Sequence, residues 1–126
     1  MSMTTPLKRV RKLGSAKEGA DHFWKQRVTA ASNAVLAIGL VALIAYLAGS
    51  DHATASAALA NPFVALMLLA LVVSGTVHMR LGMQVVIEDY VHAEGLKVVL
   101  LVANTFFAVG IALACVYAVL KLSFGA

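Results

Sequence analysis

Three long apolar blocks, at about residues 28–48, 62–87 and 98–120, dominate the sequence of 126 residues. A helix needs about 20 predominantly apolar residues to cross the hydrocarbon core of a bilayer, and each block reaches that length. Hydrophobic residues make up 61% of the chain and charged residues 13%, against roughly 25% charged residues in a soluble domain. The sequence therefore predicts an all-α integral membrane protein with three transmembrane helices and no separate soluble domain.

Positive charge is concentrated before the first apolar block. Seven of the ten Lys and Arg residues lie there: Lys8, Arg9, Arg11, Lys12, Lys17, Lys25 and Arg27. Because cytoplasmic segments carry the excess of basic residues, we expect a cytoplasmic N-terminus. Residues 1–20 are predicted to be a flexible basic tail and residues 21–126 the membrane anchor. The tail lacks the pattern of a nucleic-acid-binding domain, so we expect no nucleic-acid partner.

The polar segments between the blocks are predicted to be turns. Residues 49–61 contain no Lys or Arg and are expected to form a loop on the non-cytoplasmic side. Pro62 is expected in the first turn of the second helix, where its missing N–H has no consequence. Residues 88–97 are charged and are predicted to form a cytoplasmic turn, with a break at Gly95.

His78 is the one histidine that lies well inside an apolar block. An ionisable side chain within a membrane span is costly, so it is rarely left without a partner or a function. We interpret His78 as a candidate axial ligand to a haem held between helices, because neutral imidazole coordinates haem iron well. The alternative is a histidine that hydrogen-bonds to a neighbouring helix. A haem with two histidine ligands would take the second from another polypeptide.

Small residues surround His78 along its helix. Ser74 and Gly75 precede it by four and three residues, and Gly82 follows it by four, so all lie on its own face. One interpretation is that they leave space for a flat macrocycle, and the other is that they allow close packing of a second helix. Both interpretations predict a close neighbour on this face.

Asp89 and Tyr90 follow at the point where the second helix is expected to leave the membrane. Asp89 lies eleven residues after His78, which places both on one helix face, roughly 16 Å apart along the axis. Tyr at such a position is commonly an interfacial anchor, and Asp is commonly solvated. The functional hypothesis is that the Tyr90 hydroxyl donates a hydrogen bond to a quinone carbonyl, with Asp89 orienting neighbouring groups or water.

Two arginines lie near these groups. Arg27 precedes the first span, either as an ordinary cytoplasmic anchor or as the partner of a haem propionate, since a guanidinium pairs bidentately with a carboxylate. Arg80 lies two residues after His78, about 200° around the helix, so it should point away from the His78 face. We expect Arg80 to reach towards headgroups or to pair with a partner subunit.

The spacing His78-x3-Gly82 followed by Asp89-Tyr90, in the second of three spans, resembles that of the hydrophobic membrane-anchor subunits of succinate dehydrogenase. Arg27-x-Thr29-Ala30 at the start of the first span is also similar. The resemblance implies a subunit, not catalytic alone, that pairs with a cytochrome b membrane subunit. The pair would hold haem b, reduce ubiquinone, and dock the iron–sulfur subunit that carries the flavoprotein.

The matched positions imply a role for each residue. His78 would be this subunit's axial haem ligand, and Arg27 would lie near the haem propionates. Tyr90 would be the quinone hydrogen-bond donor, supported by Asp89. No residue is expected to bind succinate, flavin or an iron–sulfur cluster. The implied location is a bacterial inner membrane or a mitochondrial-type inner membrane, where the complex joins the tricarboxylic acid cycle to electron transport.

Two other classes fit the same topology. A fumarate reductase anchor would have this architecture, because reaction direction depends on the quinone potential and on the partner subunits. A holin-like protein with three spans and a charged tail would be non-enzymatic and would form homo-oligomers without a chromophore. An ionisable residue such as His78 inside a span argues against the holin-like class.

Overall fold

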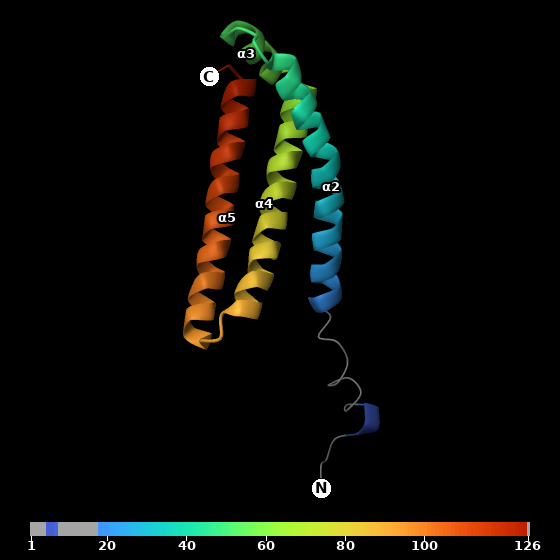
Figure 1. Ribbon diagram of the computed structural model, residues 1–126, viewed down its shortest axis with the longest axis vertical. Coiled ribbons are helices and arrows are strands. Elements are labelled where there is room, and N and C mark those ends of the chain that lie inside the picture. The colour runs from blue at the N-terminus through green and yellow to red at the C-terminus, as the bar shows by residue number, and fades with distance from the viewer. Residues whose placement is uncertain (1–4, 8–17, 126) are drawn as a thin grey trace.

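The computed structural model describes residues 5–7 and 18–125 of the chain, and this part contains three long helices. They are α2 (Glu18–Leu47), α4 (Pro62–Tyr90) and α5 (Glu94–Ser123), which run in alternating directions (Figure 1). Each is long and apolar enough to cross a membrane. The predicted all-α fold with three candidate spans is confirmed. Most of the predicted tail lies outside the described residues, and residues 18–20 belong to α2.

The connection between the first two long helices contains a short helix, so the prediction of a loop over residues 49–61 is wrong. Gly49 has a φ of 80°, a left-handed conformation that suits glycine, and it turns the chain out of α2. Helix α3 (His52–Ala60) follows. Asp51 caps it by accepting the Thr54 N–H at 2.9 Å, which satisfies one of the free donors of the first turn.

Helix α4 begins where the sequence predicts and ends later. The side-chain oxygen of Asn61 accepts the Phe63 N–H at 2.9 Å, and Pro62 occupies the first turn as expected. The helix continues to Tyr90, beyond the expected end of the span near residue 87.

The second turn is shorter than the predicted segment 88–97. Only residues 91–93 separate α4 from α5, and Gly95 lies inside the first turn of α5 instead of breaking the chain. Glu94 in the first turn and Lys121 in the last turn of α5 have the charges that favour those helix ends. Both α4 and α5 therefore include charged residues beyond their apolar blocks. A helix need not end where the apolar block ends.

Helix α4 lies between α2 and α5 and packs against both, while α3 contacts α4 and α5 at one end of the bundle (Figure 1). Four of the described residues are buried: Ala65, Leu81, Ile87 and Ala108. Large apolar side chains stand outwards, such as Ile38, 72% exposed, and Phe106, 73% exposed. A surface of this kind needs lipid or another protein to cover it.

One face of α2 follows a heptad spacing and packs on α4. The residues at alternating intervals of four and three are half-buried along the whole helix: His22, Gln26, Thr29, Asn33, Leu36, Leu40, Leu43 and Leu47. This spacing is typical of two helices that cross at a small angle. We call the first four of these residues the polar seam, because they place polar side chains against α4 at the end of α2 that carries the N-terminus.

Candidate functional site

His78 lies on α4 and contacts the polar seam of α2. Its Nδ1 is 3.0 Å from Oγ1 of Thr29. Ser74, one turn earlier on α4, donates its hydroxyl to the backbone carbonyl of Thr29 at 3.3 Å. Two polar contacts therefore join α2 and α4 at Thr29, and the predicted alternative of a histidine bonded to a neighbouring helix is realised in this structure.

The small residues around His78 divide into two groups. A Cβ at Gly82 would lie 3.6 Å from the side-chain nitrogen of Gln26, so that side chain already covers Gly82. Ser74 is likewise in contact with α2. The interpretation that these two residues leave room for a macrocycle is therefore wrong, and they allow close helix packing instead. Gly75 differs, because a Cβ there would meet nothing within 4 Å.

Three atoms of the polar seam are buried without a hydrogen-bond partner in the described part of the chain. They are His22 Nε2, Gln26 Oε1 and Asn33 Oδ1. Such atoms are uncommon, because each loses its hydration without replacement. None of the seam residues was predicted as a site residue, although their alternating spacing of four and three is visible in the sequence and predicts a shared helix face.

Asp89 and Tyr90 lie in the last turn of α4 and are exposed, Tyr90 by 77%. Neither contacts another described side chain through a hydrogen bond or an ion pair. Tyr90 follows His78 by twelve positions, which corresponds to about 18 Å along the helix. The structure therefore does not bring Asp89 and Tyr90 close to His78, and it leaves the Asp89 carboxylate and the Tyr90 hydroxyl accessible.

Arg27 lies on α2, two residues before Thr29, and is exposed. Its guanidinium carbon is 5.0 Å from the centre of the Phe23 ring, a cation–π arrangement that holds the side chain beside an apolar ring. Among the described residues it has no acidic partner. Arg27 thus keeps its full set of donors for a carboxylate from outside this chain.

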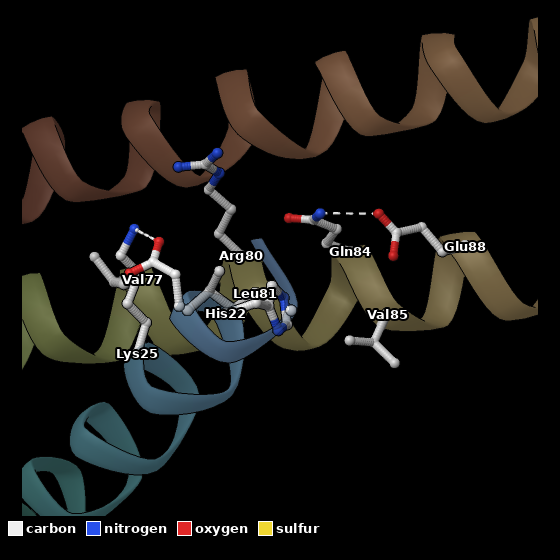
Figure 2. A pocket seen from close by; sticks show the side chains of 10 residues that line it. His22, Lys25, Val77, Arg80, Leu81, Gln84, Val85 and Glu88 are labelled. Atoms are coloured by element: carbon white, nitrogen blue, oxygen red, sulfur yellow. Dashed lines mark hydrogen bonds and ion pairs between the residues drawn. The ribbon is translucent and has the colours of Figure 1, made fainter. Parts of the chain in front are cut away.

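A groove of about 800 Å³ opens between the first turns of α2 and the last turns of α4 (Figure 2). Several charged side chains line it, and most pair locally. Lys25 forms an ion pair with Asp21, and the Gln84 side-chain amide donates to Glu88 at 2.8 Å. Arg80 extends towards α5 in Figure 2 and has no acidic partner among these described residues. Val77, Leu81 and Val85 also line it, so the lining is mixed, unlike the mostly apolar pockets that hold small organic ligands.

The contact between α4 and α5 is held partly by Asn104. Its side-chain amide donates to the backbone carbonyl of Arg80 at 3.0 Å. Beside it an apolar groove of about 430 Å³ lies along both helices, with Met79, Met83 and Phe107 in its wall. The two grooves therefore differ in chemistry, and only the one between α4 and α5 is apolar.

Residues 1–112 match the succinate dehydrogenase/fumarate reductase transmembrane subunit family. The succinate dehydrogenase hydrophobic membrane anchor subunit of Paracoccus denitrificans is 31% identical over 126 residues, which cover 100% of this chain and 97% of that protein. The subunit of the same name from Rickettsia bellii is 34% identical over 96 residues, 76% of this chain and 77% of the relative. No solved structure matches significantly. The chain therefore belongs to the family of succinate dehydrogenase/fumarate reductase transmembrane subunits.

Proposed function

We propose that this chain is the hydrophobic membrane anchor of a succinate:quinone oxidoreductase and pairs with a cytochrome b membrane subunit. Together the two would dock the iron–sulfur subunit, which carries the flavoprotein. The names of the Paracoccus and Rickettsia relatives support this role. So do three apolar helices with only four buried residues among those described, since such a chain needs other molecules to cover its faces. The anchor itself would contribute no residue to the site that oxidises succinate, and it would not be catalytic alone.

The contact between His78 and Thr29 is the observation that carries the cofactor proposal. Nδ1 is held at Thr29, whereas Nε2 has no hydrogen-bond partner in the described chain. A histidine that binds a metal through one ring nitrogen commonly donates from the other to a protein group. Open space next to Gly75, one turn before His78, is available to a large group. These residues fit a haem b shared with the partner subunit, and the partner would supply the second axial ligand. When bound, the haem would serve as a one-electron carrier.

Arg27 is proposed to pair with a haem propionate. Its guanidinium is exposed and is held beside Phe23 without an acidic partner in the described region. A guanidinium forms two parallel hydrogen bonds with a carboxylate, so a propionate is a suitable partner.

Tyr90 and Asp89 are proposed to contribute to the site that reduces ubiquinone. The Tyr90 hydroxyl is a hydrogen-bond donor without a partner among the described side chains, and it lies at the end of a long apolar helix. Asp89 beside it is exposed and therefore in reach of water, which quinone reduction needs as a source of protons. The partner subunits would complete the apolar walls of the pocket.

The proposed orientation has the N-terminus in the cytoplasm of a bacterium, with the spans in the inner membrane. The excess of Lys and Arg before α2, and their absence from residues 49–61, supports this orientation. The first residues of α2 and the turn after α4 then face the same side, where the iron–sulfur subunit would dock.

The haem assignment is tested by a reduced-minus-oxidised optical spectrum of the purified complex. We expect a b-type spectrum that is lost or altered by His78→Ala. His52→Ala is the matched control, because His52 lies exposed on α3 at the other end of the bundle, and it should leave the spectrum unchanged. An unchanged spectrum in the His78 variant would contradict the assignment.

The quinone assignment is tested with Tyr90→Phe, which removes one hydroxyl and keeps the ring. Loss of one hydrogen bond to the quinone should lower succinate–ubiquinone reductase activity by about three- to tenfold. Haem content and succinate oxidation with a water-soluble dye acceptor should not change. Tyr117→Phe, on an exposed site of α5, is the control. Equal quinone reduction in both variants would refute the role of Tyr90.

A further inference from the structure

We propose that Thr29 is a positioning residue for the haem, because its hydroxyl accepts a hydrogen bond from Nδ1 of the His78 ring. Nε2 would then carry the lone pair and be ready to bind iron before the haem arrives. The inference rests on the proposed role of His78 as a haem ligand. It adds a residue from a different helix and predicts which ring nitrogen faces the metal.

The argument starts from the surroundings of the Thr29 hydroxyl. Oγ1 is 2.7 Å from the backbone carbonyl oxygen of Lys25 and 3.2 Å from that of Gln26. A hydroxyl has one proton to donate and two lone pairs, whereas a carbonyl oxygen can only accept. The proton of Thr29 therefore goes to these carbonyls, chiefly to the nearer one. This local bond is common for Thr within helices.

The direction of that bond indicates which ring nitrogen of His78 donates to Thr29. Nδ1 lies 3.0 Å from Oγ1, and the part of the hydroxyl that remains for it is a lone pair. Nδ1 must therefore carry a proton and donate it to Thr29. In a neutral imidazole one nitrogen is the donor and the other is the acceptor, so Nε2 has the free lone pair that a metal needs.

Two further contacts hold Thr29 opposite His78. Ser74 donates to the carbonyl of Thr29 at 3.3 Å, one turn before His78. One turn after His78, the Gln26 side chain packs over Gly82, where even a methyl group would be in van der Waals contact. These contacts fix the height of α2 against α4 on both sides of the histidine. The orientation of the ring is therefore built into the packing of the chain.

A hydrogen bond from the outer nitrogen of a metal-bound histidine increases the basicity of the ligand, and its loss typically lowers metal affinity by about 10–100-fold. A more basic axial ligand favours ferric over ferrous iron. Removal of the Thr29 hydroxyl should therefore weaken retention of the haem and raise its reduction potential.

The test uses the whole complex with three variants. Thr29→Val keeps the branched shape and removes the hydroxyl, Thr29→Ser keeps the hydroxyl, and Thr105→Val removes a hydroxyl that bonds only the Leu101 carbonyl on α5. Haem loss to an excess of a haem-scavenging protein and a redox titration of the b-type spectrum are measured. We expect Thr29→Val to lose haem about 10–100-fold more readily, with a raised potential. Thr29→Ser and Thr105→Val should resemble the wild type.

The outcomes separate this inference from the proposed function. Wild-type haem retention and potential in Thr29→Val, together with loss of the spectrum in His78→Ala, would overturn the role of Thr29 alone. A spectrum that survives His78→Ala would overturn the haem assignment itself. If Thr29→Val does not assemble, the ¹⁵N resonances of His78 in the full wild-type chain in micelles decide. A proton on Nδ1 supports the inference, and a proton on Nε2 overturns it.

Discussion

Two glycines on α4 should respond differently to the same substitution, because only one of them is covered by α2. Gly75 and Gly82 are seven residues apart, and both are replaced by Leu. Glycine in a helix is about 0.8–1.0 kcal/mol less favourable than Ala, and Leu recovers most of this difference. At Gly75 nothing lies within 4 Å of the added Cβ, so the free energy of unfolding of the isolated chain should rise by up to this amount.

At Gly82 the added Cβ has an ordinary contact of 3.6 Å with Gln26, but the three further carbons of Leu have to displace that side chain. Overpacking of this kind costs about 1–3 kcal/mol, whereas the gain in helix propensity is the same at both positions. Gly82→Leu should therefore be less stable than Gly75→Leu by about 1–3 kcal/mol. The assay is SDS unfolding of the full chain in mixed micelles, followed by fluorescence of Trp24, the single tryptophan, which lies on α2. Equal stability of the two variants would refute the proposed contact between α2 and Gly82.

Three other substitutions test separate contacts. Asn33→Leu replaces a buried oxygen without a partner and should stabilise the chain by about 1 kcal/mol in the same unfolding assay. Asn104→Leu removes the bond to the Arg80 carbonyl and should destabilise it by about 0.6 kcal/mol. Hydrogen bonds from the side chain and backbone of Thr54 lower the pKa of Asp51 from its ordinary value of 3.8. The ionised carboxylate therefore stabilises α3 at pH values above 3.8, and this stabilisation is lost as the pH falls through the lowered pKa. Protection of the α3 amides from hydrogen exchange, taken relative to their intrinsic rates at each pH, should therefore fall in acid in the wild type but not in Asp51→Asn, which caps without titrating. The same loss of protection in both would contradict the capping role.

The three long helices were predictable because a bilayer leaves the backbone few choices. An apolar block of about 20 residues without water must satisfy its own hydrogen bonds as a helix. The same reasoning failed for α3, where a short segment rich in Ala was interpreted as a loop from its position between two spans. Asp51 directly before this segment is a residue type favoured at the start of a helix, and in the structure it caps α3 by accepting the Thr54 N–H.

The sequence singles out His78, but it does not predict that His78 contacts Thr29. His78 is visible as an ionisable residue within an apolar block, whereas Thr29 is 49 positions away in the chain. The heptad spacing of α2 identifies the face that Thr29 shares with Gln26, but it does not give the height of that face against α4. The contacts between the helices set the position of α2 along α4, and they identify Ser74 and Gly82 as packing residues.

The position of α2 along the axis of α4 also bears on the two proposed sites, those at His78 and at Tyr90. Thr29 lies opposite His78, so the last twelve residues of α4, from 79 to 90, run beside the polar first turns of α2 instead of its apolar part. This is about 18 Å of helix. The proposed haem ligand thus lies opposite Thr29, within the polar seam, while Tyr90 lies at the end of α4, exposed and without a described partner. A haem there needs walls from another membrane subunit, and a quinone at Tyr90 needs a neighbour that reaches the membrane surface. Under the proposed assignments the single chain would provide one edge of each site, at two different depths, which is the arrangement expected of one member of a larger complex.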